Sequence, residues 1–202
     1  MTLTDKDRRL LRISTAIVLG RWDDARAARA EAPAGEPDRA WREAVLQTHL
    51  FAGFPRLVQA YTELDPVGGL GEPSSEELEG PAPDVERGAA LFDAIYGDGS
   101  AKVRALLAGH HADFERWILE HAYARVLARP GLSADRRELL ATCALAALGQ
   151  DRQLASHARG ALRCGATSAE LSASLDATAD LIDPERLERA RRIAARFDAD
   201  PR

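Results

Sequence analysis

The chain has only two cysteines among its 202 residues, which excludes most chemistry that depends on paired thiols. Cys143 and Cys164 are too few for a disulfide framework and too far apart for a CxxC redox pair. Free cysteine packs as a small hydrophobic residue. We therefore expect both cysteines to be structural.

An excess of positive charge is also missing. The 27 lysines and arginines are outnumbered by 32 aspartates and glutamates, which gives a formal net charge of -5. A nucleic-acid or anionic-membrane partner would require a basic face that displaces counterions. No apolar run approaches the length of a bilayer span, and residues 1–9 carry charges where a signal peptide has its apolar core. We expect a cytoplasmic protein with no nucleic-acid or membrane partner.

The sustained alternation of apolar and polar residues that is typical of strands is absent as well. Apolar residues instead recur at spacings of three and four, as in the stripe formed by Leu139, Leu140, Cys143, Ala144, Ala147 and Leu148. With 46% hydrophobic residues, the chain can bury one good core and a small second one. The sequence therefore predicts an all-α protein.

Common cofactor motifs are not found in the chain. Walker, GxGxxG and GxSxG patterns are absent, which argues against nucleotide binding and serine hydrolysis. His110 and His111 precede Asp113, but adjacent histidines on a helix point in different directions, and no HExxH or Cys/His spacing accompanies them. We expect neither a metal nor a cofactor.

The two ends of the chain share a spacing of apolar and glycine positions. A shift of 129 residues places Leu3 on Leu132, Arg8 on Arg137, Leu10 and Leu11 on Leu139 and Leu140, Leu19 and Gly20 on Leu148 and Gly149, and Ala32 on Ala161. Thr4 and Ser133 are the expected N-caps of the two corresponding helices, and Gly20 and Gly149 are the expected C-caps. We predict two degenerate helical repeats; the alternative is chance similarity between two alanine-rich hairpins.

Residues 65–84 are rich in proline, glycine and serine, the composition of a mobile linker or a long surface loop. We therefore predict an N-terminal degenerate half-repeat at 1–65, a Gly/Pro-rich linker or loop at 66–84 and a second helical domain at 85–202. Within the second domain, we expect helices at residues 85–96, 101–107, 112–128 and 184–197.

Three consecutive stretches of the second domain carry the pattern of a known family. Residues 120–132 are a helix pattern ending in an Arg-Pro-Gly-Leu turn, residues 137–149 place Glu138 on an apolar helix, and residues 154–167 place His157 on another. In this order they resemble the carboxymuconolactone decarboxylase family and its alkylhydroperoxidase D-like relatives, and residues 47–56 are similar to the family too. The resemblance implies an all-α, alkylhydroperoxidase D-like helical bundle that forms a homo-oligomer.

The peroxidase relatives have a CxxC pair between their glutamate and their histidine. Here Glu138 and His157 occupy the two outer positions, while Gln150 and Gln153 occupy the cysteine positions. The thiolate is the nucleophile of a thiol peroxidase. The departure from the family pattern therefore argues against peroxidase activity.

The decarboxylase branch of the family lacks these cysteines as well. Resemblance to it implies a cofactor-free lyase or isomerase that acts on a small carboxylated substrate, with His157 as general acid or base and Glu138 orienting it. Candidate substrate-binding residues are Arg129 and Arg159 as carboxylate anchors, with Gln150, Gln153, Tyr123, Phe51 and Phe54. Two alternatives are a histidine that Glu138 satisfies without catalysis and a non-catalytic oligomeric scaffold or ligand-binding protein.

The first half has no acid–histidine pair, because the 129-residue offset places Arg9 at the position of Glu138 and Ala28 at that of His157. We expect a composite pocket between the halves, to which the second half contributes the pair and the first half contributes Phe51, Phe54 and the helix end at residues 47–49. In the alternative interpretation, the first half only stabilises the second.

Overall fold

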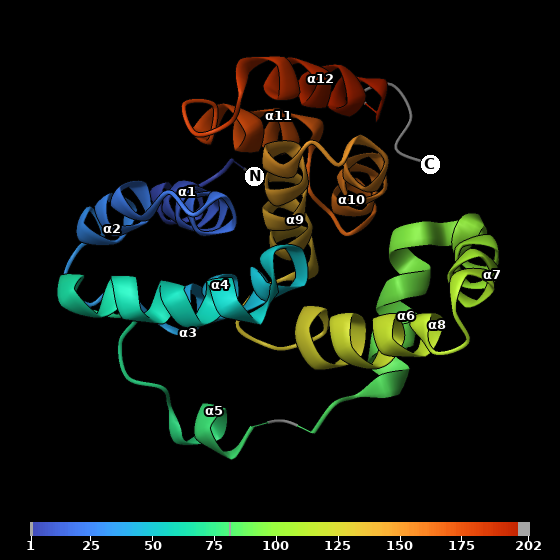
Figure 1. Cartoon of the computed structure of the whole chain (residues 1–202), viewed down its shortest axis with the longest axis horizontal. Coiled ribbons are helices and arrows are strands. Elements are labelled where there is room, and N and C mark those ends of the chain that lie inside the picture. The colour runs from blue at the N-terminus through green and yellow to red at the C-terminus, as the bar shows by residue number, and fades with distance from the viewer. Residues whose placement is uncertain (1, 81, 198–202) are drawn as a thin grey trace.

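The computed structural model describes residues 2–80 and 82–197, and every regular element in these ranges is helical (Figure 1). The all-α prediction is therefore confirmed. Residue 81, in the predicted linker, and residues 198–202, at the end of the predicted second domain, lie outside the described residues.

The helices form three consecutive groups. The first group contains α1 (Asp5–Leu19), α2 (Trp22–Ala30), α3 (Arg39–Gln47), α4 (His49–Leu64) and the 3₁₀ turn η1 (Asp65–Val67). The middle group contains α5 (Ser75–Glu79), α6 (Val85–Tyr96), the 3₁₀ turn η2 (Gly97–Gly99), α7 (Ser100–His110), α8 (Phe114–Trp117) and the π-helix η3 (Ile118–Leu127). The last group contains α9 (Ala134–Leu148), α10 (Asp151–Arg163), α11 (Ser168–Ala177), α12 (Pro184–Ala194) and the 3₁₀ turn η4 (Ala195–Phe197).

The predicted helix ends of α1 and α9 agree with the structure. Thr4 caps α1 through a capping box with Asp7, and Ser133 occupies the N-cap of α9 without a capping hydrogen bond from its side chain. Gly20 and Gly149 end the two helices with φ angles of 72° and 69°. Glycine is favoured at both ends because this left-handed conformation is costly for residues with a Cβ.

The first and last groups have the same helix register. α1 and α9 begin at Asp5 and Ala134, which are 129 residues apart, and the same interval separates the starts of α2 and α10 and those of α3 and α11. Figure 1 shows α9 near the middle of the molecule, with α1 on one side and α10 on the other. The two hairpins therefore share one interface rather than forming separate cores.

Two apolar clusters hold the chain together. The larger cluster joins the first and last groups and includes Ile13, Ile17, Trp41, Leu139, Leu154 and Leu171, all nearly inaccessible to solvent. The smaller cluster, within the middle group, consists of Phe92, Ile95, Tyr123 and Leu127. Leu50 of α4 packs against this smaller cluster and α6 packs against α10, so the middle group contacts both the first and the last group.

The helix predicted at residues 112–128 differs from the expected regular α-helix. It forms the single turn α8 and then the wider η3, in which the amide of Ala128 donates to the carbonyl of Tyr123, five residues earlier, at 2.8 Å. Gly88 of α6 lies against this helix, and a Cβ at Gly88 would come within 2.6 Å of the Ala124 backbone. The backbones of α6 and η3 approach closely because Gly88 has no side chain.

The predicted linker contains a short helix, which its composition did not indicate. α5 begins after Ser74, which forms a capping box with Glu77. The Glu77 carboxylate also binds Arg42 of α3 at 2.7 Å, and this hydrogen-bonded guanidinium lowers the pKa of Glu77 to about 2. An ion pair therefore attaches the segment to the first group.

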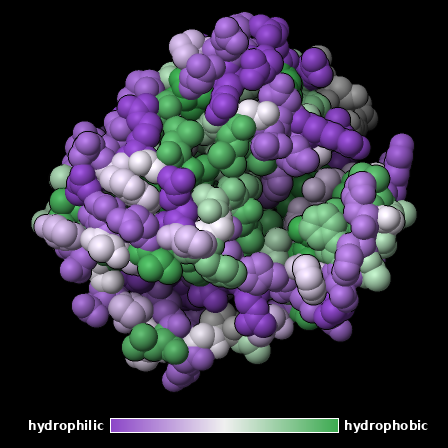
Figure 2. Space-filling model, in the orientation of Figure 1, coloured by the Kyte–Doolittle hydropathy of each residue, from purple (hydrophilic) through white to green (hydrophobic). Residues whose placement is uncertain are grey.

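Most of the face seen in Figure 1 is hydrophilic, with apolar side chains gathered near its centre and over the region of α6 to α8 (Figure 2). Phe54 on α4 and Trp117 on α8 are both more than half exposed.

Candidate functional site

The predicted acid–histidine pair forms within the hairpin of α9 and α10. His157 Nδ1 lies 2.8 Å from Glu138 Oε2. The side chain of His157 is 14% exposed, and that of Glu138 is 1% exposed. A carboxylate only accepts hydrogen bonds, so Nδ1 carries the proton of this contact and Nε2 is the second, exchangeable nitrogen.

Gly160 provides the space for the Glu138 carboxylate, a role that sequence reasoning missed. A Cβ at Gly160 would lie 2.6 Å from Glu138 Oε2 and 2.8 Å from Ile95 Cγ2. Gly160 follows His157 on α10, within the motif that carries the family resemblance. A glycine inside a helix costs stability, and that cost is the signal that could have identified it.

Two opposing effects set the pKa of His157. Burial alone would lower it, because the imidazolium loses hydration, but the charge of Glu138 and the hydrogen bond to it together raise the pKa above its ordinary value. Burial also raises the pKa of Tyr123 and Tyr96, with a contribution from the nearby Glu138 charge. The pair therefore sits in a water-poor environment in which the protonated imidazole has its own counterion.

The first half contributes one aromatic residue to this pair. The rings of Phe51 and His157 meet edge to face, with centroids 6.4 Å apart. Phe51 lies in the first turn of α4, so one predicted component of the composite pocket adjoins His157. Phe54 lies elsewhere: it is 60% exposed and stacks on His49 with a centroid distance of 4.9 Å.

Phe54 belongs to a cleft of about 450 Å³ between α4 and the α8–η3 segment. Its lining residues come from both sequence halves: His49, Leu50, Gly53 and Phe54, and Trp117, Ile118, His121 and Ala122. Gly53 has a φ of 80°, which breaks α4 into two parts. The cleft lining does not include His157.

Two histidines meet in this cleft, a contact that sequence reasoning missed. The Nε2 atoms of His49 and His121 are 2.9 Å apart, and His49 Nδ1 contacts the carbonyl oxygen of Leu46. Burial lowers the pKa of His121, and the neighbouring His49 and Arg125 lower it further. No local motif connects positions 49 and 121, which lie 72 residues apart in the sequence and meet only in the folded chain.

The two predicted carboxylate anchors are both engaged. Arg129 binds the carboxylate of Glu43 through contacts of 2.9 to 3.0 Å, and Arg137 binds the same carboxylate at 2.8 Å. Arg159 lies over the ring of Phe197 at 5.0 Å and is exposed. Arg129 therefore belongs to a buried ion-pair network, whereas Arg159 keeps its charge at the surface.

The remaining predicted site residues lie in different environments. Gln150 and Gln153 are exposed at the start of α10, and Gln153 lies one helical turn before His157. Tyr123 is only 3% exposed and packs edge to face on Phe92. A substrate therefore has direct access to the glutamines and not to Tyr123.

Neither cysteine has a reactive environment. Burial raises the pKa of Cys143 to about 11 and that of Cys164 to about 12, with the Glu138 charge adding to the shift at Cys164. Low-pKa thiolates are the reactive ones. Among residues 2–80 and 82–197, no group of three or more His, Cys, Asp or Glu side chains is arranged to hold a metal ion.

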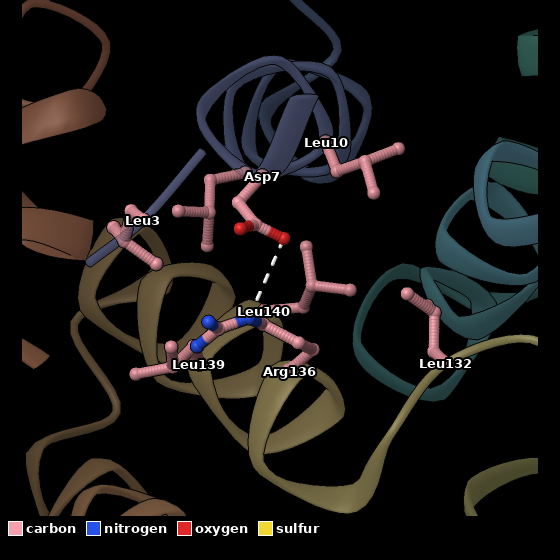
Figure 3. A pocket seen from close by; sticks show the side chains of 8 residues that line it. Leu3, Asp7, Leu10, Leu132, Arg136, Leu139 and Leu140 are labelled. Atoms are coloured by element: carbon pink, nitrogen blue, oxygen red, sulfur yellow. Dashed lines mark ion pairs between the residues drawn. The ribbon is translucent and has the colours of Figure 1, made fainter. Parts of the chain in front are cut away.

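A further small pocket lies between α1 and α9 (Figure 3). Leucines line it, and Asp7 pairs with Arg136 across it at 3.4 Å. Its volume of about 10 Å³ is enough for one water molecule at most. This pocket is a packing defect in the interface and not a substrate site.

Residues 112–196 match the family described as Carboxymuconolactone decarboxylase family. A 135-residue stretch, 64% of this chain, is 27% identical to Peroxisomal protein 2 of Schizosaccharomyces pombe (strain 972 / ATCC 24843) and covers 62% of that protein. The resemblance expected from the motifs around Glu138 and His157 is therefore confirmed over residues 112–196.

No helix among the described residues is both long enough and apolar enough to cross a membrane.

Proposed function

We propose that this chain, whose residues 112–196 match the carboxymuconolactone decarboxylase family, is a cofactor-free proton-transfer enzyme of that kind. The proposed reaction is a lyase or isomerase reaction on a small carboxylated molecule. The contact between His157 Nδ1 and Glu138 Oε2, at 2.8 Å, carries the proposal. A histidine held in one tautomer by a buried carboxylate is suited to general acid–base catalysis.

In the proposed mechanism, His157 Nε2 takes a proton from the substrate and returns it to another atom. Glu138 keeps the hydrogen on Nδ1 and balances the charge of the imidazolium that forms. The raised pKa of His157 supports this role, because the protonated intermediate state becomes less costly. Phe51 covers one side of the ring and limits its movement.

The substrate class is taken from the family resemblance. Arg159 is the better of the two proposed carboxylate anchors, because its side chain is exposed, whereas Glu43 already neutralises Arg129. Gln150 and Gln153 replace the redox cysteines and offer uncharged hydrogen-bonding groups beside the histidine. Thiol peroxidase activity is not part of the proposal.

The second candidate function is a non-catalytic oligomeric scaffold or small-ligand-binding protein. The engagement of Arg129 with Glu43 favours it, because one of the two proposed anchors then serves the fold. The low exposure of Tyr123 points the same way. In this case, Glu138 and His157 would form a structural ion pair.

Ultraviolet-monitored turnover of 4-carboxymuconolactone tests the proposal. We expect turnover by the purified protein and its loss in His157→Ala. His110→Ala is the matched control, because this exposed histidine on α7 belongs to no part of the site. Equal turnover by His157→Ala would overturn the catalytic role of His157, and no turnover by any form would favour the scaffold.

We also propose that the protein is a homo-oligomer. Val58 and Tyr61 are exposed apolar residues on α4, outside the cleft lining, with exposures of 66% and 45%. Light scattering after size-exclusion chromatography should give a mass above 21.9 kDa, the mass of one chain. Val58→Lys should shift the mass towards that value, and a wild-type monomer would contradict the proposal.

We also propose that the chain is divided into three parts, at residues 1–65, 66–84 and 85–202. The two halves are proposed to have originated as repeats. The shared register of α1 to α3 and α9 to α11 supports them. A cytoplasmic location remains a prediction beside the peroxisomal name of the yeast relative. Imaging of a fluorescent fusion would distinguish the two locations.

A further inference from the structure

The hydrogen bonds of His49 determine the tautomer of His121. The carbonyl oxygen of Leu46 can only accept, so His49 Nδ1 carries its single proton and His49 Nε2 is an acceptor. His121 must then donate from Nε2 across the 2.9 Å contact. This leaves His121 Nδ1 as an unprotonated acceptor.

That nitrogen is open to a ligand. No side chain or amide in the described part of the chain donates to His121 Nδ1, and the atom is not among the buried polar atoms that lack a partner. His121 itself lines the cleft of about 450 Å³. The cleft therefore offers a hydrogen-bond acceptor whose partner is missing.

The charged groups around His121 favour its neutral form. Arg125 lies near it on η3, and Glu120, on the same helix, is paired with Arg116 of α8 at 3.6 Å. Arg116 also binds Asp113 at 2.6 Å. Among the α4 residues that line the cleft, His49 is the one with an ionisable side chain. Burial, His49 and Arg125 together lower the pKa of His121, which favours the neutral imidazole whose Nδ1 accepts a hydrogen bond.

The walls of the cleft are aromatic and aliphatic. Phe54 and Trp117 expose 60% and 56% of their surface, and Leu50, Ile118 and Ala122 complete the lining. The lining, among the described residues, contains no aspartate, glutamate, lysine or arginine. Such a site suits a flat apolar molecule and offers no counterion to a carboxylate.

We propose that this cleft binds an uncharged aromatic molecule whose hydroxyl or N–H group donates a hydrogen bond to His121 Nδ1. This site is additional to the proposed reaction centre. Phe51 and His49 are two residues apart in the first turn of α4 and face different sides of it, one towards His157 and the other into the cleft.

The matched probes 2-naphthol and 2-methoxynaphthalene test the site, because they share an aromatic body and differ in the donor. Isothermal titration should show 2-naphthol binding about tenfold more tightly, the value of one added hydrogen bond. His121→Phe should remove this difference and keep the affinity for 2-methoxynaphthalene. His110→Ala and His157→Ala should bind both probes as the wild type does.

Trp117→Ala provides a second variant with a different expected result. Removing this exposed wall should weaken both probes by a similar factor and preserve their ratio. Equal affinity of the wild type for the two probes, or a ratio that survives in His121→Phe, would overturn the proposal. Tighter binding of 2-naphthoate than of 2-naphthol would also overturn it, because the cleft would then favour an anion.

Discussion

The hairpins α1–α2 and α9–α10 begin in the same register and differ in what they bury. At corresponding positions, the first has Arg9 and Ala28, and the second has Glu138 and His157. Arg9 pairs with Glu36 near the surface, with exposures of 18% and 16%, whereas Glu138 is 1% exposed. The same helical frame therefore accommodates either a permanent ion pair or a pair that titrates.

The difference arises from what covers each hairpin. α6 packs on α10, where Arg163 donates to the carbonyl of Ile95 at 2.9 Å and Ile95 lies beside Gly160. Among the described residues, the second helix of the first hairpin, α2, packs mainly against α1, α4 and η1, which all belong to the first group. Burial converts a carboxylate–imidazole contact into one with a perturbed pKa. In this chain, the middle group supplies that burial.

The largest expected effect concerns the charge network that joins the halves. Glu43 is 3% exposed at its side chain and binds both Arg129 and Arg137, which itself is 1% exposed. Glu43→Ala should lower the free energy of unfolding by about 3–5 kcal/mol, because the buried guanidinium of Arg137 and the half-buried one of Arg129 lose their counterion. Urea denaturation measures this loss.

Glu36→Ala is the matched control for the first hairpin. Its partner Arg9 is nearer to the solvent, so the loss should be about 1 kcal/mol. A loss at Glu43 no larger than that at Glu36 would contradict the contrast between the halves.

Glu138→Gln should sharpen the comparison through its pH dependence. Because the native pKa of His157 is raised, the stabilisation is complete below the unfolded pKa of histidine and disappears as the pH rises through the native value. The variant should therefore lose about 2–3 kcal/mol at acidic pH and much less at alkaline pH.

Denaturation at several pH values, with NMR titration of His157, measures the effect of Glu138→Gln. The native pKa of His157 should fall in the variant. A destabilisation that is the same at every pH would show that the charge of the imidazolium does not contribute.

Gly53→Ala should cost about 1–2 kcal/mol, because residue 53 has a φ of 80° and alanine avoids this region. Asp183 provides a comparison at the start of another helix. It caps α12 with a negative φ, so Asp183→Ala should remove only an N-cap, at about 1 kcal/mol. Thermal unfolding compares the two variants. An unchanged transition in Gly53→Ala would argue against the bend between His49 and Phe54.

Gly160→Ala should change stability only slightly, because two effects oppose each other. Overpacking against Glu138 and Ile95 costs about 1–3 kcal/mol, and the better helix propensity of alanine offsets about 1 kcal/mol of it. The net loss should be about 1 kcal/mol, with a displaced Glu138 and a lower pKa of His157. An unchanged pKa in NMR titration would contradict the role assigned to Gly160.

Local signals in the sequence predicted much of the fold. Caps at Thr4, Gly20 and Gly149 have a mechanism that acts within one turn, and the structure confirms them. The capping-box pattern at Ser74 and Glu77 was a similar signal for α5, but the proline and glycine content of residues 65–84 outweighed it. Compositional reasoning alone misses a single helical turn.

The site was predictable only where a family pattern covers it. The positions of Glu138 and His157 follow from the motifs, and their hairpin brings them together. The pairing of His49 with His121 joins residues 72 positions apart, and His121 lies on a π-helix, which has no reliable sequence signature. The engagement of Arg129 by Glu43 is likewise a tertiary contact.

The close contact of Gly88 with Ala124 has an evolutionary consequence. Any side chain at Gly88 would push η3 away from α6, and His121, three residues before Ala124, would move with it. Among relatives that keep both His49 and His121, residues 88 and 124 should therefore stay small. Relatives that have lost the histidines should be free to vary there, so these four positions should change together among relatives of this chain.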